Sequence, residues 1–346
     1  MTELERRIKA KIPGPDTGIE VRHTMCDICS PGMHCGINAY IKDGKVIKIE
    51  GIDGHPSNDG RLCTKGMANR EYIYREDRIK TPLRRVGKRG EGRFEPISWE
   101  EAYAEIAKGL NRCKEKYGAE SVAFYSGYSK WYRQMLRRLA YAFGSPNYGC
   151  ESSACYTAAF MAWKVAAGEQ GNPDMGHSDL FLGWAFNPFY SSYMGAHSAM
   201  KLKEKGLKFL IVDTRRTPAT EKLADLFLQP KTGTDGALAH AIANVLIEND
   251  WIDRPYIDRY VYGFEEYAAY VKQFNEGNIQ SITGVPYSRV VAAARLIHEN
   301  PRMSCNESSA PLCHHRNGLQ NYRSVMALLA ITGNFDRTGG QKLSVH

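Results

Sequence analysis

The 346-residue sequence contains no long hydrophobic run. Its longest apolar stretches, such as residues 122–125 and 209–212, are far shorter than the roughly 20 residues that a membrane-spanning helix needs. Arg6 and Arg7 are followed by neither an apolar segment nor a small-residue cleavage site, so they do not resemble a twin-arginine export signal. We therefore expect no membrane span and a cytoplasmic location.

A concentrated basic block is also missing. The 46 Lys and Arg residues outnumber the 38 Asp and Glu residues, giving a formal charge of +8, but they are scattered among the acids. Because nucleic-acid binding requires a concentrated basic patch, we expect no nucleic-acid partner. No Walker loop and no G-x-G-x-x-G follows any expected strand, which argues against ordinary ATP or NAD binding.

Cysteine, in contrast, is abundant, with nine residues in the chain. In a reducing compartment these thiols favour metal binding or chemistry over a disulfide framework. Cys26, Cys29 and Cys35 lie within ten positions, and Cys63 follows after 27 intervening residues. The Asp-Gly pair at 43–44 lies between alternating Ile and Val residues, which predicts a hairpin that returns Cys63 to the first three thiols.

Three uses of these four cysteines can be compared. Structural zinc sites are usually built from two paired knuckles, whereas only Cys26 and Cys29 form such a pair. A compact C-x2-C-x5-C run with one remote cysteine resembles ferredoxin-type ligation, which favours a [4Fe–4S] cluster. Zinc and plain buried cysteines remain alternatives. Lys65, two residues beyond Cys63, is either a solvated lysine or a cation beside the cluster.

After about residue 90 the pattern becomes one of alternating strands and helices. Ser98 and Glu101 have capping-box spacing and begin an amphipathic helix. Strands are expected at 121–127, 179–184, 208–213 and 302–308, with helices that include 130–144 and 191–206. We therefore predict an α/β protein, with a small β-rich iron–sulfur domain over residues 1–90 and a parallel-sheet α/β region over 91–346.

Polar residues follow the expected strands, at the edge where ligands bind in parallel sheets. A carboxylate and two guanidinium groups at one strand end could hold a nucleotide, or could form an exposed charged turn. A Gly-Thr-Asp sequence precedes a long apolar helix, where backbone N–H groups could meet a phosphate or a guanine oxygen, although the aspartate could be only an N-cap. The residues concerned are Asp213, Arg215 and Arg216, and Gly233, Thr234 and Asp235.

A Gly/Ser-rich loop at residues 145–156 contains Cys150 and Cys155 and leads into a further expected helix. A thiolate at a helix N-terminus has a lowered pKa and is a better nucleophile or metal ligand. The alternative is a pair of buried structural cysteines.

Taken in order, these motifs resemble the dimethyl sulfoxide reductase family, whose members carry molybdenum or tungsten on two molybdopterin guanine dinucleotides. The resemblance runs from about residue 20 to the end of the sequence. It rests on the N-terminal cysteines, "RLCTKG", "DRIKTPLRRVG", "ISWEEAYAEIA", "GSPN", the Cys155 loop, "VDTRRT", "TGTDGALA" and "ITGNFDRTGG".

The resemblance implies a role for each candidate residue. Cys26, Cys29, Cys35 and Cys63 would hold the [4Fe–4S] cluster, with Lys65 on the electron path to the pterin. Cys155 would ligate the molybdenum or tungsten. The remaining matched positions would contact the pterins and their guanine dinucleotides, or lie near the active centre. They are Gly183, Asn187, Asp213, Arg215, Arg216, Gly233, Thr234 and Asp235 for the cofactor, and His314, His315, Asn317 and Gly318 for the centre.

The implied activity is two-electron oxidoreductase chemistry on a small substrate, with electrons relayed through the cluster. Tyr156 follows Cys155 where similar formate dehydrogenases have histidine, which disfavours formate. The alternatives are a non-redox hydratase of the acetylene hydratase kind, which the position of Asp27 disfavours, and an electron-transfer subunit. Because family members continue for a comparable length, we expect either that the sequence is a fragment or that a complementary C-terminal polypeptide supplies the other half, and we also expect an electron-transfer partner subunit.

Overall fold

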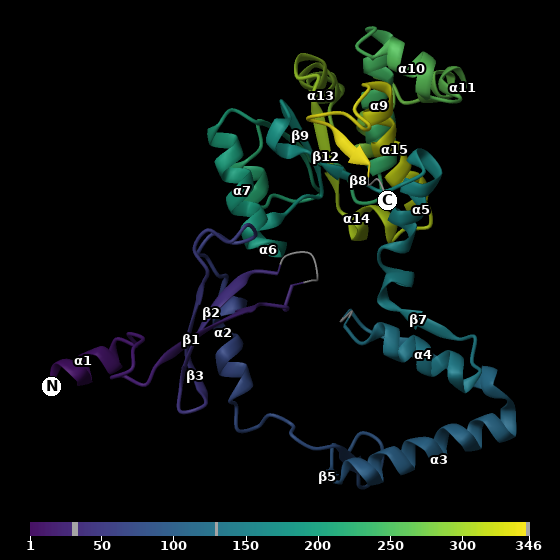
Figure 1. Ribbon diagram of the computed structural model, residues 1–346. Helices are drawn as coiled ribbons and strands as arrows, with labels where there is room; N and C mark the ends of the chain where they lie inside the picture. The colour runs from purple at the N-terminus through teal and green to yellow at the C-terminus, as the bar shows by residue number, and fades with distance from the viewer. Residues whose placement is uncertain (30–33, 129–130, 344–346) are drawn as a thin grey trace. The chain divides into compact units, whose positions relative to one another are not determined.

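The computed structural model describes residues 1–29, 34–128 and 131–343 (Figure 1). Residues 30–33, in the predicted cysteine loop, residues 129–130, which include the first residue of the helix predicted over 130–144, and residues 344–346 lie outside the described residues. The chain divides into two compact units, Met1–Glu151 and Ser152–His346, which we describe separately.

Unit 1 begins with a short helix and a three-stranded antiparallel sheet in the order β1-β2-β3. Asp43 and Gly44 form the turn between β2 and β3, and both have positive φ, 50° and 71°, as a type I′ turn requires. The predicted hairpin is therefore confirmed. These elements are α1 (Glu3–Lys9), β1 (Glu20–Met25), β2 (Gly36–Lys42), β3 (Lys45–Gly51) and α2 (Thr64–Ile73).

The second part of unit 1 contains two small sheets and two longer helices. Ser98 caps α3 as predicted: its hydroxyl accepts from the Glu101 N–H, and its own N–H donates to the Glu101 carboxylate. The α3 helix nevertheless has no buried residue, and Ile106 is 58% exposed. The elements are β4 (Leu83–Arg85), β5 (Phe94–Pro96), α3 (Trp99–Tyr117), β6 (Phe124–Ser126), α4 (Arg133–Phe143) and β7 (Tyr148–Cys150), with a 3-10 turn at Ala119–Ser121.

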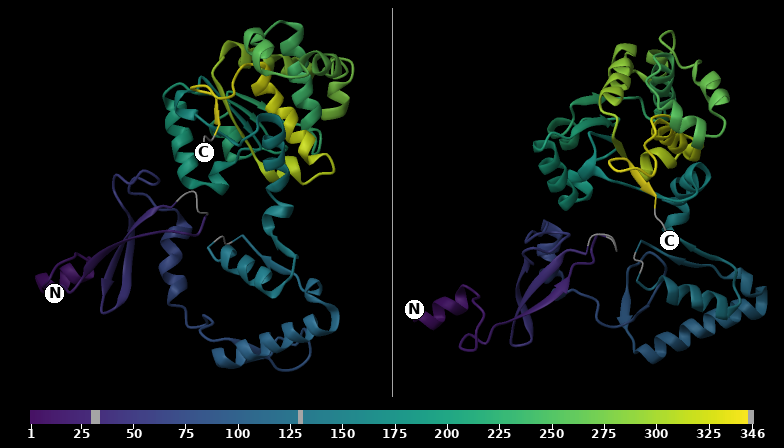
Figure 2. Two further views of the ribbon diagram at one scale, coloured as in Figure 1. Left: turned by 45° about the vertical axis from the view of Figure 1, so that its right-hand side comes forward. Right: turned by 45° about the horizontal axis from the view of Figure 1, so that its top comes forward.

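Unit 2 is built on a four-stranded parallel sheet in the order β11-β10-β9-β12. The strands β9, β10 and β11 are apolar runs because helices cover both faces of the sheet, whereas β12 contains the buried polar residues Ser304 and Glu307. Helices α9 and α15 lie on one side of this sheet and α7 on the other (Figures 1 and 2). Side chains of β9 alternate between two cores: Leu182 packs with the α9, α13 and α15 side, and Phe181 packs with the α7 and α8 side. The strands are β9 (Leu180–Trp184), β10 (Lys208–Val212), β11 (Leu226–Leu228) and β12 (Met303–Glu307).

The remaining elements of unit 2 surround this sheet. The helices are α5 (Thr157–Ala167), α6 (Pro188–Ser191), α7 (Tyr193–Glu204), α8 (Pro218–Lys222), α9 (Asp235–Glu248), α10 (Arg254–Tyr260), α11 (Phe264–Val271), α12 (Ile279–Thr283), α13 (Tyr287–Glu299), α14 (Ser309–Cys313) and α15 (Gly318–Ile331). A two-stranded antiparallel sheet joins β8 (Gly171–Pro173) to β13 (Gln341–Leu343), and 3-10 turns cover Glu151–Ala154 and Met175–His177.

The strand order places a topological switch point between β9 and β12. From β9 the chain proceeds outward through β10 to β11, and it then returns through a long helical segment to add β12 on the other side. Ligands of such sheets bind at the carboxyl ends of the strands that flank a switch point. The expected strand at 121–127 is formed as β6, but it pairs with β7 in unit 1 and does not join this sheet.

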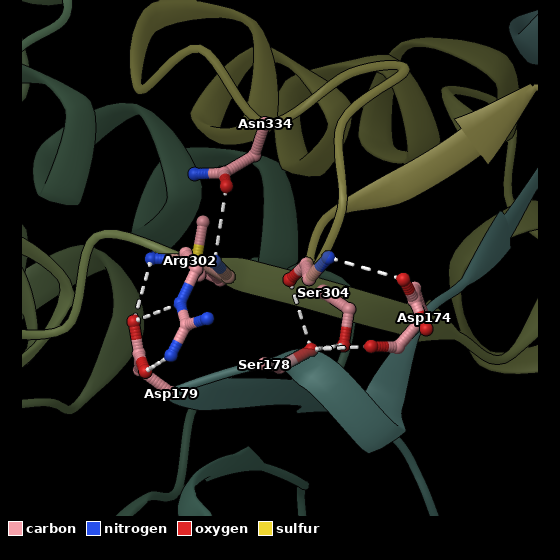
Figure 3. Close-up of polar contacts among 8 residues, drawn as sticks. Asp174, Ser178, Asp179, Arg302, Ser304 and Asn334 are labelled. Carbon is pink, nitrogen blue, oxygen red and sulfur yellow. Dashed lines mark hydrogen bonds and ion pairs between the residues drawn. The ribbon is translucent and has the colours of Figure 1, made fainter.

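The amino ends of β9 and β12 are held by a polar network (Figure 3). The Asp179 carboxylate accepts two hydrogen bonds from the Arg302 guanidinium, at 2.9 and 2.5 Å. The Ser178 and Ser304 hydroxyl oxygens are 2.7 Å apart, and the Ser178 hydroxyl also lies 2.9 Å from the Asp174 carbonyl oxygen. This network fixes the end of the sheet opposite the expected ligand edge.

The outer edge of β12 is closed by side chains. Asn334 and Gln341 are both buried. The Met303 N–H donates to Asn334 Oδ1 at 3.0 Å, and the Cys305 N–H donates to Gln341 Oε1 at 3.2 Å. Because an open strand edge exposes unpaired backbone groups, these two side chains take the place of a fifth strand.

Within the described residues, no helix has the length and apolar character needed to cross a membrane.

We expect Asn334→Ala to destabilise unit 2, because it leaves the buried Met303 N–H without an acceptor. Urea unfolding should show a loss of about 1–3 kcal/mol in the free energy of unfolding. Asn249→Ala, at an exposed helix end, is the matched control and should cost about 0.5 kcal/mol or less. Equal losses in the two variants would contradict this role for Asn334.

Candidate functional site

The first candidate cysteines lie where β1 and β2 meet. Cys26 follows β1 directly, and Cys35 immediately precedes Gly36, the first residue of β2. The Cys26 N–H donates to the Cys35 carbonyl oxygen at 2.9 Å, so the ladder between the two strands continues to these residues. The antiparallel pairing therefore holds the two cysteines opposite each other.

Cys63 is brought to the same place by Asn58. The buried Asn58 accepts a hydrogen bond from the Gly36 N–H at 2.7 Å and donates to the Gly36 and Arg61 carbonyl oxygens at 3.0 and 2.7 Å. Cys63 then forms the N-cap of α2, where its Sγ accepts from the Gly66 N–H at 3.4 Å. A Cβ added to Gly66 would lie 3.9 Å from Cys26 Sγ, so the start of α2 lies close to Cys26.

The four thiols influence one another electrostatically. Burial raises the pKa of the Cys26 thiol, and the nearby Cys29 and Cys63 raise it further. Burial likewise raises the pKa of the Cys35 thiol, with additional contributions from Cys26, Cys63 and Cys29. A metal cation or a positively charged iron–sulfur core would remove the repulsion between the thiolates. The four cysteines are therefore chemically suited to bind such a centre.

The described residues nevertheless contain no group of three or more His, Cys, Asp or Glu side chains already arranged as metal ligands. The four cysteines are therefore near enough to influence one another, but the described residues do not hold them in a preformed coordination geometry. Lys65 is exposed on the first turn of α2.

Cys155 lies in unit 2, two residues before the first residue of α5. Its N–H donates to the Ser152 carbonyl oxygen at 3.2 Å, and its carbonyl oxygen accepts from the Ser309 hydroxyl at 2.8 Å. Ser309 is the first residue of α14, directly beyond the carboxyl end of β12. The half-buried Cys155 is therefore tied to the β12 end of the sheet.

The end of β9 supplies two of the predicted residues. Gly183 is a packing requirement, because a Cβ there would lie 2.7 Å from Ile211 Cδ1 and 2.9 Å from Phe186 Cβ. Asn187 caps α6, and its side-chain Oδ1 is buried with no hydrogen-bond partner among the described residues. A buried acceptor of this kind suits a ligand that donates a hydrogen bond.

The end of β10 supplies the three charged residues. Asp213 is half-buried, and burial raises the pKa of its carboxyl group. Its Oδ1 accepts from the Arg215 N–H at 3.2 Å, which fixes the turn. Arg215 and Arg216 are exposed, and their guanidinium carbons lie 5.9 Å from the ring centroids of Tyr190 and Phe227, respectively.

The start of α9 supplies the third predicted group. Gly233 has φ of 83°, a conformation that favours glycine, and Thr234 is the N-cap residue. Asp235 is buried and accepts a hydrogen bond from the Trp184 indole N–H at 2.8 Å, which joins the end of β9 to α9. Burial raises the pKa of the Asp235 carboxyl group, while this hydrogen bond opposes the increase. Asp235 is thus the first residue of α9 and not its N-cap, and its side chain links the helix to the sheet.

The two histidines differ in their contacts. His315 Nε2 donates to the Pro311 carbonyl oxygen at 2.8 Å, and a Cβ on Gly233 would lie 3.9 Å from His315 Cε1. His314 is exposed at the C-cap of α14. A cavity of about 1600 Å³ beside α9 and α15 is lined by Gly233, Thr234 and Asn317 among others. Of the predicted residues, Cys155, Asn187 and Asp213 do not line it.

Comparison with known proteins decides the family. Residues 78–345 match the family model "Molybdopterin oxidoreductase", and residues 19–75 match "Molybdopterin oxidoreductase Fe4S4 domain". The chain belongs to the molybdopterin oxidoreductase family.

The names of similar proteins agree with this family assignment. It is 33% identical over 324 residues to the probable oxidoreductase YoaE of Bacillus subtilis, covering 92% of this chain and 47% of the relative. It is 29% identical over 331 residues to the thiosulfate reductase molybdopterin-containing subunit PhsA of Salmonella typhimurium, covering 94% and 43%. The structure of acetylene hydratase from Pelobacter acetylenicus matches with a TM-score of 0.83 and 28% identity, covering 94% of this chain and 45% of that chain. The chain thus spans less than half the length of each of these relatives.

Two residues of this family member were missed by sequence reasoning, Asn58 and Ser309. Asn58 contacts Gly36, 22 positions away, and Ser309 contacts Cys155, 154 positions away. Each is a polar residue whose importance comes from a contact with a distant part of the chain. Such contacts cannot be inferred from the residues that neighbour it in the sequence.

We expect Asn58→Ala to separate Cys63 from Cys35, because it leaves the buried Gly36 N–H without its acceptor and removes the link to the Arg61 carbonyl oxygen. The free energy of unfolding should fall by about 1–3 kcal/mol in urea titrations, and iron bound per chain should fall with it. Asn111→Ala, on an exposed position of α3, is the control and should change neither. Wild-type iron content and stability in Asn58→Ala would contradict this positioning role.

Proposed function

We propose that this chain forms the cofactor-binding half of a molybdopterin enzyme that carries out two-electron chemistry on a small substrate. The observation that supports it best is the hydrogen bond from Ser309 to the Cys155 backbone, which ties a cysteine before a helix to the carboxyl edge of the sheet. Such an edge, at a switch point, is where α/β proteins bind their ligands.

Residues at this edge fit a pterin carrying guanine dinucleotides. Asn187 offers a buried acceptor without a partner, Gly233 exposes backbone in a glycine conformation, and Arg215 and Arg216 are exposed cations suited to phosphates. We propose that Gly183, Asp213, Thr234 and Asp235 complete the contacts and that Cys155 is the protein ligand of molybdenum or tungsten. His314 and His315 are proposed to lie near the substrate.

The N-terminal cysteines fit a [4Fe–4S] cluster. We propose Cys26, Cys29, Cys35 and Cys63 as its ligands and Lys65 as a residue on the electron path. When bound, the pterin metal supplies two-electron redox chemistry and the cluster supplies one-electron transfer. The protein's part is to hold the thiols, bind the phosphates and orient the substrate. A domain boundary near residue 90 and a cytoplasmic location stay predictions.

A hydratase without net redox change is a second candidate function. The likeness to the acetylene hydratase structure, at a TM-score of 0.83, favours it. A third candidate function is an electron-transfer subunit that holds only the cluster. The Cys155 site argues against this function, because such a subunit would not need a second metal site.

We also propose a complementary polypeptide as partner. Names of relatives, such as "F420-dependent formate dehydrogenase 1 subunit alpha", describe subunits. The β6–β7 pair is parallel, a type of sheet that is normally covered on both faces, and Met135 and Leu139 of α4 are 72% and 50% exposed. A segment like the other half of the relatives, with strands and apolar helix faces, would cover α3, α4 and this sheet.

Metal analysis tests the cluster assignment. The anaerobically purified chain should contain about four iron atoms per chain, and Cys63→Ala should lose most of them because one of four ligands is removed. Cys113→Ala, on α3 and outside the candidate sites, should keep its iron. Zinc in place of iron, or full iron in Cys63→Ala, would contradict the assignment.

A Cys155→Ala variant tests the pterin site. In the enzyme assembled with its partner, turnover should fall at least about 100-fold, since a first ligand matters more than the outer contacts that cost 10–100-fold. Iron content should not change. Consumption of a reduced redox dye during turnover supports a reductase, whereas turnover without dye consumption supports the hydratase. A Cys155→Ala variant with wild-type turnover would exclude the ligand assignment.

A further inference from the structure

Glu307 is a buried carboxyl group that the proposed function does not use. It is the last residue of β12, and its side chain is only 8% exposed. Oε1 is buried with no hydrogen-bond partner among the described residues, while Oε2 lies 3.4 Å from the Tyr322 hydroxyl oxygen, which donates to it. A buried carboxyl group with one unsatisfied oxygen is costly to keep ionised, so its presence calls for an explanation.

Its place in the sheet is the switch point. Glu307 pairs in register with Trp184, the last residue of β9, and β9 and β12 are the two strands that flank the reversal of strand order. Glu307 therefore stands at the carboxyl edge where a ligand of this sheet is expected. Asn187, with its own unpartnered oxygen, follows three residues after Trp184.

Glu307 and Cys155 share their surroundings. Ser309, two residues beyond Glu307, donates to the Cys155 carbonyl oxygen. Cys313, at the end of α14, is influenced by both residues: burial raises the pKa of its thiol to about 11, and the nearby Cys155 and Glu307 add to the increase. Cys313 thus lies within electrostatic range of both Glu307 and Cys155.

The groups around Glu307 favour its acid form. Burial raises the pKa of its carboxyl group to about 7, although hydrogen bonds with Cys305 and Tyr322 oppose the increase. The titratable groups that face it are Cys305 on β12, Tyr322 on α15, Tyr156 before α5 and Cys313 on α14. Burial raises the pKa of each of these four groups, so they hold their protons at neutral pH, and the described surroundings of Glu307 include no cation that would hold it ionised.

We propose that Glu307 is the proton-exchanging group of the Cys155 site. The inference rests on the proposed function. Reduction of an oxygen-bearing substrate AO consumes two electrons and two protons and yields A and water. The electrons would be supplied by the [4Fe–4S] cluster that Cys26, Cys29, Cys35 and Cys63 are proposed to hold. The Glu307 O–H bond breaks to supply one proton, the solvent supplies the other, and the carboxylate then recovers its proton from solvent.

The structure gives Glu307 the properties of such a group. It is a carboxyl group beside the expected substrate position, with its proton held near neutral pH, where a general acid works best. Its burial favours the protonated form, so the proton is present near neutral pH before each turnover. Tyr322 holds one carboxylate oxygen and leaves the other to interact with the ligand.

Glu307→Gln is the decisive variant, because glutamine keeps the shape and the hydrogen-bond acceptor but cannot exchange a proton. In the assembled enzyme we expect iron and molybdenum or tungsten contents to stay at wild-type levels. Turnover should fall about 10²- to 10³-fold, and its pH dependence near neutrality should disappear. Glu299→Gln, at an exposed position of α13, is the matched control and should leave turnover unchanged.

A spectroscopic readout on the metal-free chain is independent of turnover. The infrared C=O band of a protonated carboxylic acid should be lost with a midpoint near pH 7 in wild type and be absent from Glu307→Gln. Tyr322→Phe removes a hydrogen bond that favours the carboxylate and should move the midpoint to higher pH. This second variant tests the assignment even if glutamine disturbs folding.

The same group makes stability pH-dependent, with a defined sign. The pKa of Glu307 is higher in the folded chain, about 7, than in the unfolded chain, about 4.5, so the folded state binds its proton more tightly. The stabilisation that Glu307 contributes is therefore fully present below about pH 4.5 and is lost as the pH rises to about 7. Between pH 5 and 8 the folding equilibrium constant should fall by about two orders of magnitude more in wild type than in Glu307→Gln.

The outcomes separate this inference from the proposed function. A Glu307→Gln enzyme with normal metal content, wild-type turnover and an unchanged pH profile overturns the role of Glu307 and leaves the proposed function standing. An infrared midpoint near the ordinary glutamate value also overturns it. A wild-type enzyme without molybdenum or tungsten overturns the proposed function and this inference together.

Discussion

The alignment of parallel strands at one edge is the constraint on which unit 2 depends. Four strands in the order β11-β10-β9-β12 bring the loops after β9, β10 and β12 to the same side, and the Trp184–Asp235 hydrogen bond adds the start of α9. Residues that are far apart in the sequence become neighbours only because these strands share one register. The amino ends, locked by the Asp179–Arg302 ion pair and the serine contacts, provide the rigid base. Rigid strands with functional loops at one end are the usual solution for positioning chemistry.

Signals that act over a few residues were read correctly from the sequence. The Asp43-Gly44 turn and the Ser98–Glu101 capping box depend on backbone conformation and on hydrogen bonds between close neighbours. Three of the four strands of the main sheet were recognised: β9 and β10 are apolar runs, whereas β12 is more polar. The three-residue strand β11 was too short to be recognised, and β6 has the same local pattern as the main strands but pairs elsewhere. Local pattern predicts that a strand forms, whereas its partner depends on the whole chain.

The candidate site shows the same division. The cysteines and the strand-end residues could be named because their residue types and spacing are unusual. Asn58, Ser309 and Glu307 could not, since each acquires its meaning from burial and from partners 15 to 154 positions away. The resemblance to a family identified the candidates for cofactor binding, and the geometry identified the residues that place them. The proton-exchange role inferred for Glu307 came from an unsatisfied oxygen, a feature that has no counterpart in the sequence.

The closure of β12 by Asn334 and Gln341 has a consequence for how the chain is made. Synthesis proceeds from the amino end, so β9, β10 and β11 leave the ribosome well before β12, and β12 before the two side chains that cover its edge. Until residue 341 has emerged, a nascent β12 exposes donors that could pair with another strand. Unit 2 therefore reaches its protected form only after residue 341 has emerged, and chaperone binding during that interval would matter more for this sheet than for one whose edge is closed by an earlier strand.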